Sequence, residues 1–105
     1  MNISPSIGTP WAGYTDRKGE GMEGVHDPLL AIALFIDNGE KLIALCSVDH
    51  LGFTYEMAQG ATQEIHSYPK LEECEIFIAS SHTHSGGGAY LNILFWEPLL
   101  ECPWL

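Results

Sequence analysis

The fold is decided by residues 29–48, which read LLAIALFIDNGEKLIALCSV. Two apolar runs, residues 29–37 and 41–48, flank the dipeptide Asn38-Gly39. Asn-Gly between apolar runs is the strongest short signal for a β-hairpin, because a type I′ turn needs positive φ at both central residues. We therefore predict two antiparallel strands, and their unbroken apolar character predicts that both are buried on both faces.

A helix and a third strand are predicted after the hairpin. The helix runs from about Thr54, its N-cap, to His66, and Pro69 closes it. Its apolar stripe recurs at steps of four and three residues and consists of Phe53, Met57, Ala61, Ile65 and Tyr68. Residues 74–79, CEIFIA, form the third strand. Because strand–helix–strand crossovers are right-handed, the second and third strands should pair in parallel.

The predicted fold class is therefore α/β: a β-hairpin followed by a βαβ unit, in a small mixed sheet with a helix packed on it. With 105 residues the chain is expected to form a single domain. Gly and Pro recur through residues 1–28, which predicts an extended arm whose Trp11 and Tyr14 pack against another part of the protein. Residues 89–105 are an apolar tail that either covers the sheet as a further layer or stays exposed.

The charge balance argues against several classes of partner. The chain carries 14 acidic and 4 basic residues, for a net charge of -10. We expect no nucleic-acid surface and no polybasic membrane patch, because both need clustered Lys and Arg. The longest apolar run, residues 29–36, is too short for a transmembrane helix. No signal peptide is evident, so a cytoplasmic location is the default expectation.

Functional side chains are expected where the parallel strands end. The second strand runs into Asp49 and His50, and the third runs into residues 80–88, SSHTHSGGG. In an extended segment residues i and i+2 project to one side, so His82 and His84 could converge on one metal ion. A catalytic zinc takes three protein ligands and a water, so this pair would supply part of a site. The alternative is two polar histidines in a surface loop.

Neighbouring residues could assist such a site. Asp49 could orient a metal-bound histidine, and the backbone at Ser85 and Gly86 could bind an anion or a developing oxyanion. A flexible turn is the alternative for that segment. Ser85 with His84 as its base would make a serine hydrolase, a third reading that lacks an evident orienting group.

Four blocks of sequence, taken in order, resemble a known family. They are residues 7–14 (IGTPWAGY), 24–29 (GVHDPL), 47–52 (SVDHLG) and 79–86 (ASSHTHSG). Together they resemble the N-terminal portion of the neutral/alkaline non-lysosomal ceramidases, and more closely the bacterial homologues of unassigned substrate. The resemblance covers about residues 3–88. Gly87 departs from the family, which usually has Ser-Gly-Pro here, and residues 89–105 do not continue its pattern.

The resemblance implies a zinc-dependent amidase of lipid metabolism, in which metal-activated water cleaves an N-acyl amide. By match, His82 would bind the zinc and His84 would polarise the scissile carbonyl or hold substrate. Asp49 is expected to support the catalytic group, and Ser85 and Gly86 to contact the substrate, an N-acylated small molecule or lipid such as a sphingolipid. The family includes exported members.

The same resemblance implies that the site is incomplete in these 105 residues. In the family a further histidine, a glutamate and a tyrosine complete the zinc site from positions far downstream. The chain is therefore expected to be truncated and inactive as a hydrolase by itself. The runner-up is a non-enzymatic interaction module, in which the apolar tail docks on a partner or on a second copy and the histidines only stabilise their loop.

Overall fold

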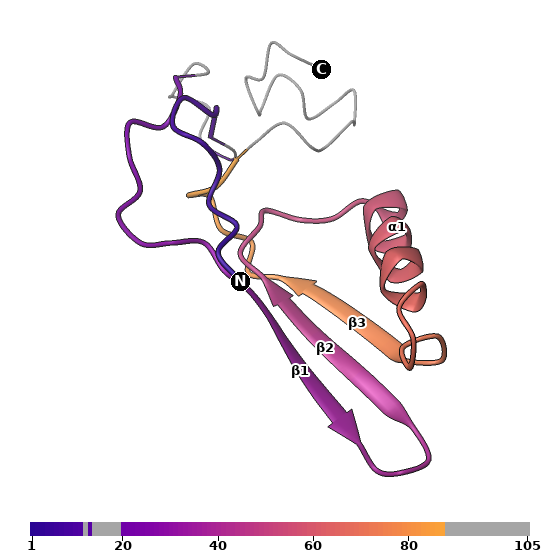
Figure 1. Ribbon diagram of the computed structural model, residues 1–105. Coiled ribbons are helices and arrows are strands. Elements are labelled where there is room, and N and C mark those ends of the chain that lie inside the picture. The colour runs from indigo at the N-terminus through magenta and orange to yellow at the C-terminus, as the bar shows by residue number, and fades with distance from the viewer. Residues whose placement is uncertain (12, 14–19, 88–105) are drawn as a thin grey trace.

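The computed structural model describes residues 1–11, 13 and 20–87, and its regular elements are three strands and one helix (Figure 1). In chain order they are β1 (Ala31–Asp37), β2 (Leu42–Val48), α1 (Tyr55–His66) and β3 (Glu75–Ser80). The predicted tail at residues 89–105 lies outside the described residues, as does Tyr14.

The sheet has the order β1-β2-β3 and is mixed. β1 pairs with β2 in antiparallel register from Ala31 opposite Val48 to Asp37 opposite Leu42. β2 pairs with β3 in parallel from Ile43 beside Glu75 to Val48 beside Ser80. The predicted α/β class, with a hairpin followed by a βαβ unit, is confirmed. Its consequence for function is that β2 and β3 end at the same edge of the sheet.

The hairpin turn differs from the type I′ turn that we predicted. The strands separate after Asp37 and rejoin at Leu42, so the connection has four residues, 38–41. Gly39 has a φ of 85°, whereas Asn38 is not among the residues with positive φ. Asn38 instead uses its side-chain oxygen, which accepts hydrogen bonds from the backbone N–H groups of Glu40 and Lys41 at 3.0 and 2.8 Å. An Asx-type turn thus closes the hairpin.

Helix α1 begins where the sequence predicted. The N-cap is Thr54, whose hydroxyl accepts the backbone N–H of Met57 at 3.2 Å. This bond satisfies one of the four N–H groups that a helix leaves unpaired at its start. The helix ends at His66, with Ser67 as C-cap, and the His66 ring donates to the carbonyl oxygen of Cys74 at 2.9 Å. That bond ties the end of α1 to the start of β3.

The prediction that both hairpin strands are buried on both faces is wrong. Six of the seven residues of β1 are exposed, and one face of the sheet carries a row in which Leu34, Leu45 and Phe77 lie side by side. Their exposed fractions are 58%, 41% and 57%. The prediction failed because a continuous apolar run indicates only that a strand can be buried on both faces. It does not indicate that the residues described here are enough to cover both faces.

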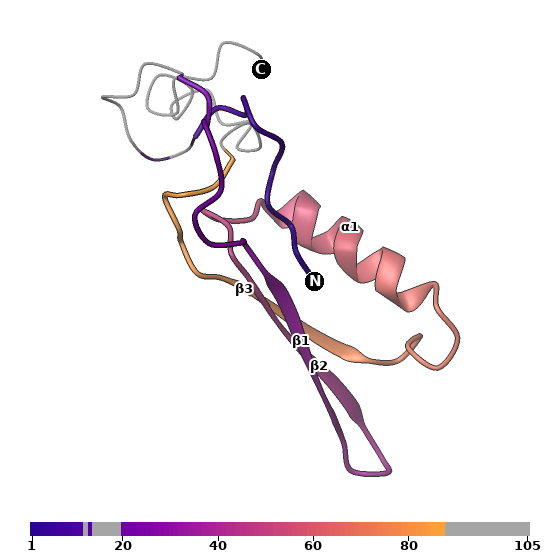
Figure 2. The same cartoon turned by 60° about the vertical axis from the view of Figure 1, so that its left-hand side comes forward.

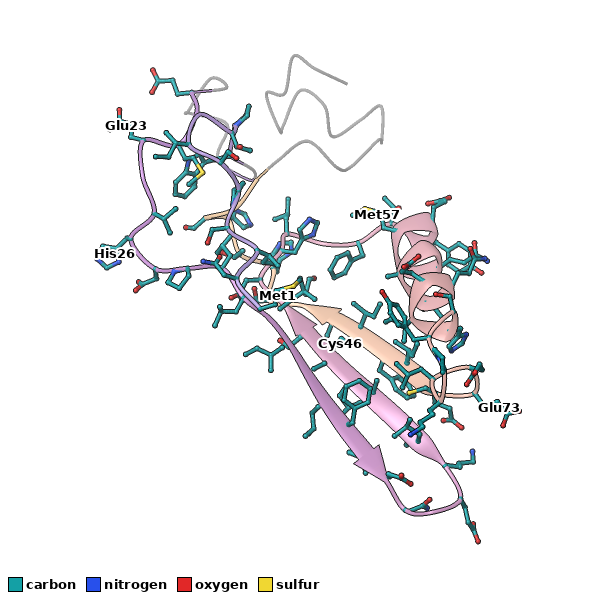
Figure 3. All side chains as sticks on the ribbon, in the orientation of Figure 1. Met1, Glu23, His26, Cys46, Met57 and Glu73 are labelled. Atoms are coloured by element: carbon teal, nitrogen blue, oxygen red, sulfur yellow. The ribbon has the colours of Figure 1, made fainter. Side chains whose placement is uncertain are left out.

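The other face of the sheet lies opposite α1 (Figure 2). Between them lies an apolar groove of about 510 Å³, to which the sheet contributes Cys46 and the helix Met57 (Figure 3). Four members of the predicted stripe line the groove, while Tyr68 is 56% exposed and lies apart from it. The stripe therefore faces the sheet, although no residue of α1 is fully buried.

The N-terminal arm reaches both the sheet and the loop after β3. Met1 pairs with Ala31 through two backbone hydrogen bonds of 2.8 and 2.9 Å. Further along, Trp11 forms an antiparallel bridge with Gly87. Residues far apart in sequence are thus brought to the edge of the sheet where β2 and β3 end. Within the described residues, no helix has the length and apolar character needed to cross a membrane.

Candidate metal centre

The predicted site residues lie directly after the last paired residues of β2 and β3. Val48 and Ser80 close the parallel ladder, and Asp49 and Ser81 follow them. The ladder is extended by two backbone bonds, from Asp49 N–H to Leu30 and from Ser81 N–H to Val48, at 2.8 and 3.0 Å. The segment that contains the two histidines therefore leaves the sheet from a fixed point.

His82 and His84 lie close to each other, as their spacing predicted. Their ring centroids are 5.2 Å apart and the ring planes meet at 68°. An ion about 2.0–2.1 Å from one nitrogen of each of two imidazoles, at a tetrahedral angle, places the ring centroids about 5 Å apart. The separation of these two rings fits a shared zinc ion.

Both rings are held by backbone carbonyl groups. His82 Nδ1 lies 2.7 Å from the carbonyl oxygen of Leu51, and His84 Nδ1 lies 3.0 Å from that of Gly13. A carbonyl oxygen only accepts hydrogen bonds, so Nδ1 is the protonated nitrogen in each neutral ring. The lone pair is then on Nε2 of both rings. Metal-binding histidines are commonly fixed in this tautomer by such a bond from the other ring nitrogen.

The two carbonyl partners come from distant parts of the chain. Leu51 is buried and lies in the loop between β2 and α1, and Gly13 belongs to the N-terminal arm. Sequence reasoning missed both, since the contacting atoms are backbone oxygens and any residue type supplies one. Gly13 alone carries a signal: its φ is 84°, and an added Cβ would overlap the His84 ring, 2.6 Å from Cγ.

The backbone at His82 is unusual for a residue with a side chain. Its φ is 58°, in the left-handed region, so the chain turns at His82 instead of continuing extended from β3. This conformation costs an L-residue about 1–2 kcal/mol. Histidine tolerates it better than most residues, and such strain clusters at functional sites. The two rings meet here through a turn and not through the simple strand alternation from which we predicted their convergence.

Asp49 is near this segment but faces a different neighbour. Its carboxylate accepts the backbone N–H of Leu30 at 2.9 Å. It lines a cavity of about 630 Å³ together with Ser81, Thr83 and Ser85, whereas His82 and His84 do not line that cavity. The structure therefore brings the two histidines together, and it brings Asp49 together with the hydroxyl groups of the same loop.

Ser85 and Gly86 form the turn after the histidines. The backbone N–H of Ser85 bonds to the Thr83 hydroxyl at 3.1 Å. Gly86 is buried, and an added Cβ would lie 3.1 Å from Leu29 Cδ1, so a larger residue there would need the Leu29 side chain to shift. Within the described part of the chain, the Ser85 hydroxyl makes no hydrogen bond to His84, the base that the serine-hydrolase reading needs.

The remaining histidines have other surroundings. His50 stacks on Phe53, with centroids 4.8 Å apart, and bonds to the carbonyl oxygen of Gly52. Burial lowers the pKa of His50 below its usual value of 6.5, and the bond to Gly52 opposes this shift. His26 bonds to Asp27 at 2.8 Å on the outside of the arm (Figure 3).

Two ligands do not complete a zinc site. Among residues 1–11, 13 and 20–87, no three His, Cys, Asp or Glu side chains come together as a group that could hold a metal ion. Comparison of the chain with family models, curated proteins and solved structures found no match.

Proposed function

We propose that this chain contributes the His82–His84 pair to a zinc-dependent amidase of the ceramidase type, which hydrolyses an N-acyl amide. The observation that carries the proposal is that both rings donate Nδ1–H to backbone carbonyl groups, with their centroids 5.2 Å apart. Two imidazoles prepared in the same tautomer at this separation suit one ion. The resemblance of four sequence blocks to the ceramidases supports the reaction type.

In this proposal His82 is the zinc ligand, and His84 binds the metal with it or holds the scissile carbonyl. Zinc in such a site lowers the pKa of a bound water and polarises the carbonyl. Gly13 and Leu51 would fix the two rings, and the turn at Ser85 and Gly86 would contact substrate. The 105-residue chain should bind zinc weakly and hydrolyse no N-acyl amide, because a catalytic zinc needs at least three protein ligands.

The test is a zinc titration of the 105-residue chain, followed by competition with a chromophoric chelator. His82→Ala should weaken zinc binding at least tenfold, roughly the least that metal-site substitutions usually cost. His84→Ala should have the same effect if His84 is a second ligand, and no effect on zinc binding if it holds the carbonyl. The matched control is His26→Ala, since His26 is 97% exposed and lies on the outside of the arm. Zinc affinity that is unchanged in His82→Ala would sink the metal proposal, and zinc-dependent amide hydrolysis by the chain alone would refute the claim that it is incomplete.

A second candidate function is an interaction module without enzymatic activity, and the exposed apolar face of the sheet favours it. Contiguous apolar patches on soluble proteins commonly mark contact sites. The predicted docking segment at residues 89–105 lies outside the described residues. Sedimentation velocity with metal analysis separates the two functions. A metal-free dimer that dissociates on Phe77→Lys would favour the module, and a zinc-binding monomer would favour the amidase.

A further inference from the structure

The cavity that contains Asp49 lies beside the segment that carries His82 and His84, and neither histidine lines it. Its volume of about 630 Å³ is in the range of small-molecule sites. It lies between the N-terminal arm and the start of the loop after β3. Its walls come from the arm, from the entrance to β1, from the end of β2 and from residues 81, 83 and 85.

One wall of the cavity is polar. Asp49, Ser81, Thr83 and Ser85 all line it. Among the described residues, the only bond to the Asp49 carboxylate is that from the backbone of Leu30, which occupies Oδ2. The Thr83 hydroxyl accepts the Ser85 N–H and keeps a second lone pair that can accept another hydrogen bond. A carboxylate oxygen and three hydroxyl groups therefore line the same cavity.

The acidic side chains that line the cavity are those of Asp27 and Asp49. Asp27 stands at its rim beside His26. The two lysines among the described residues are elsewhere, because Lys41 pairs with Glu75 at 2.6 Å and both Lys41 and Lys70 line a separate depression near the hairpin turn. Asp49 thus has no cationic partner within the described part of the chain. A half-buried carboxylate in that situation favours a cationic ligand.

Most of the remaining lining is apolar and includes an aromatic ring. The apolar residues are Pro5, Trp11, Met22, Val25, Pro28 and Leu29, and the polar residues Ser4 and His26 also line the cavity. Apolar walls do not suit a hydrated metal ion, and one carboxylate with neutral hydroxyl groups is a poor ligand set for divalent cations. An organic cation suits both parts, because its carbon body contacts the apolar walls and its charge can also lie near an aromatic face.

We propose that this cavity binds a small organic cation with a primary ammonium group, held by Asp49 and the hydroxyl groups of Ser81, Thr83 and Ser85. An ammonium group has three N–H donors, and Asp49 Oδ1 with any two of the three hydroxyl oxygens offers three acceptors. The site is independent of the proposed zinc site, since Ser81, Thr83 and Ser85 line the cavity whereas His82 and His84 do not. Binding of the cation requires neither metal nor hydrolysis.

The test is an NMR titration of the metal-free, full 105-residue chain with ethanolammonium chloride, followed at the amides of residues 81–85. Saturable shifts with a dissociation constant on the order of 1–10 mM are expected. Ethylene glycol, a neutral analogue of similar size, should bind roughly tenfold more weakly, because it lacks the charge that pairs with Asp49. Asp49→Asn keeps an oxygen for the Leu30 bond and should weaken ethanolammonium binding by a similar factor.

The matched control is Asp37→Asn at the far end of β1, where loss of one negative charge should leave binding unchanged. Equal binding of ethylene glycol and ethanolammonium by the unmodified chain would overturn the proposal, and so would the absence of saturable shifts. This comparison needs no variant and stands even if Asp49→Asn fails to fold. Loss of zinc binding in His82→Ala with retained ethanolammonium binding would show that ethanolammonium binding does not depend on the proposed zinc site.

Discussion

At the scale of single residues, the candidate centre depends on which nitrogen of each histidine carries the proton. The carbonyl groups of Leu51 and Gly13 decide this for His82 and His84. Both contacts use backbone oxygens, so neither requires a particular side chain at position 13 or 51. The arrangement therefore depends on how accurately two loops are placed, and substitutions that move the backbone should matter as much as loss of a ring.

Gly13→Ala tests this dependence on backbone placement. The added Cβ would overlap the His84 ring and would also occupy a φ of 84°, so the arm must move away from the ring. We expect zinc affinity to fall roughly 10- to 100-fold, the usual effect of losing a group that orients a metal ligand. Chelator competition measures the affinity. The control is Gly24→Ala in the same arm, where an added Cβ meets nothing within 4 Å and affinity should stay the same.

His50 predicts a component of acid sensitivity. Its pKa in the folded chain is lowered from 6.5 by burial, so below pH 6.5 the unfolded chain takes up this proton more readily than the folded chain. The contribution to stability is complete above pH 6.5 and is lost as the pH falls through the folded pKa. Urea unfolding at a series of pH values measures it.

His50→Gln should flatten the pH dependence of stability between pH 6.5 and the folded pKa, because glutamine does not titrate. His26→Gln serves as the control, because the exposed His26 ring is outside the packed part of the chain. If His50→Gln and the unmodified chain lose stability in parallel on acidification, burial of His50 is not the cause.

At the scale of elements, two glycines have opposite expected effects. Gly39 has a φ of 85° in the hairpin turn, so Gly39→Ala should destabilise the chain by about 1 kcal/mol. Gly60 lies inside α1, and an added Cβ there meets nothing within 4 Å. Gly60→Ala should therefore stabilise the chain by about 1 kcal/mol. Chemical unfolding gives the change in unfolding free energy for each variant. Changes of the same sign in the two variants would contradict this prediction.

The elements also show what the sequence could and could not predict. Asn38-Gly39 predicted the hairpin and Thr54 predicted the helix start, because turn and cap chemistry act over a few residues. The turn type was missed, since the Asn38 side chain replaced the backbone geometry that we assumed. The contact between the His84 ring and the backbone of Gly13 was also missed. It joins residues 71 positions apart, and no local pattern encodes such a contact.

At the scale of the whole molecule, the sheet is covered unequally. Among the described residues, the buried apolar side chains are only Met22, Ala44, Leu51 and Cys74. The row of Leu34, Leu45 and Phe77 remains open to solvent. A sheet with a parallel strand pair is normally covered on both faces, and this face is not covered by the described residues.

Net charge gives a whole-molecule prediction for that surface. The chain has a net charge of -10, so two copies repel each other at low ionic strength. Raising the salt concentration shortens the range of this repulsion without weakening apolar contact. Self-association through the open face should therefore increase with salt, as measured by sedimentation velocity. Association that weakens with salt would point to ion pairs instead, and Leu34→Lys should abolish it only if the face is involved.

Alternate residues of the segment 81–85 have different surroundings, and this limits how the protein can change over evolutionary time. Odd positions line the cavity with Asp49, and the two histidines at even positions bond to Leu51 and Gly13. Point substitutions alter one side and leave the other. A single-residue insertion or deletion would shift the left-handed turn at His82 and move the imidazoles away from Leu51 and Gly13. Among related proteins that keep either proposed site, we expect the residue types in this segment to vary more than its length.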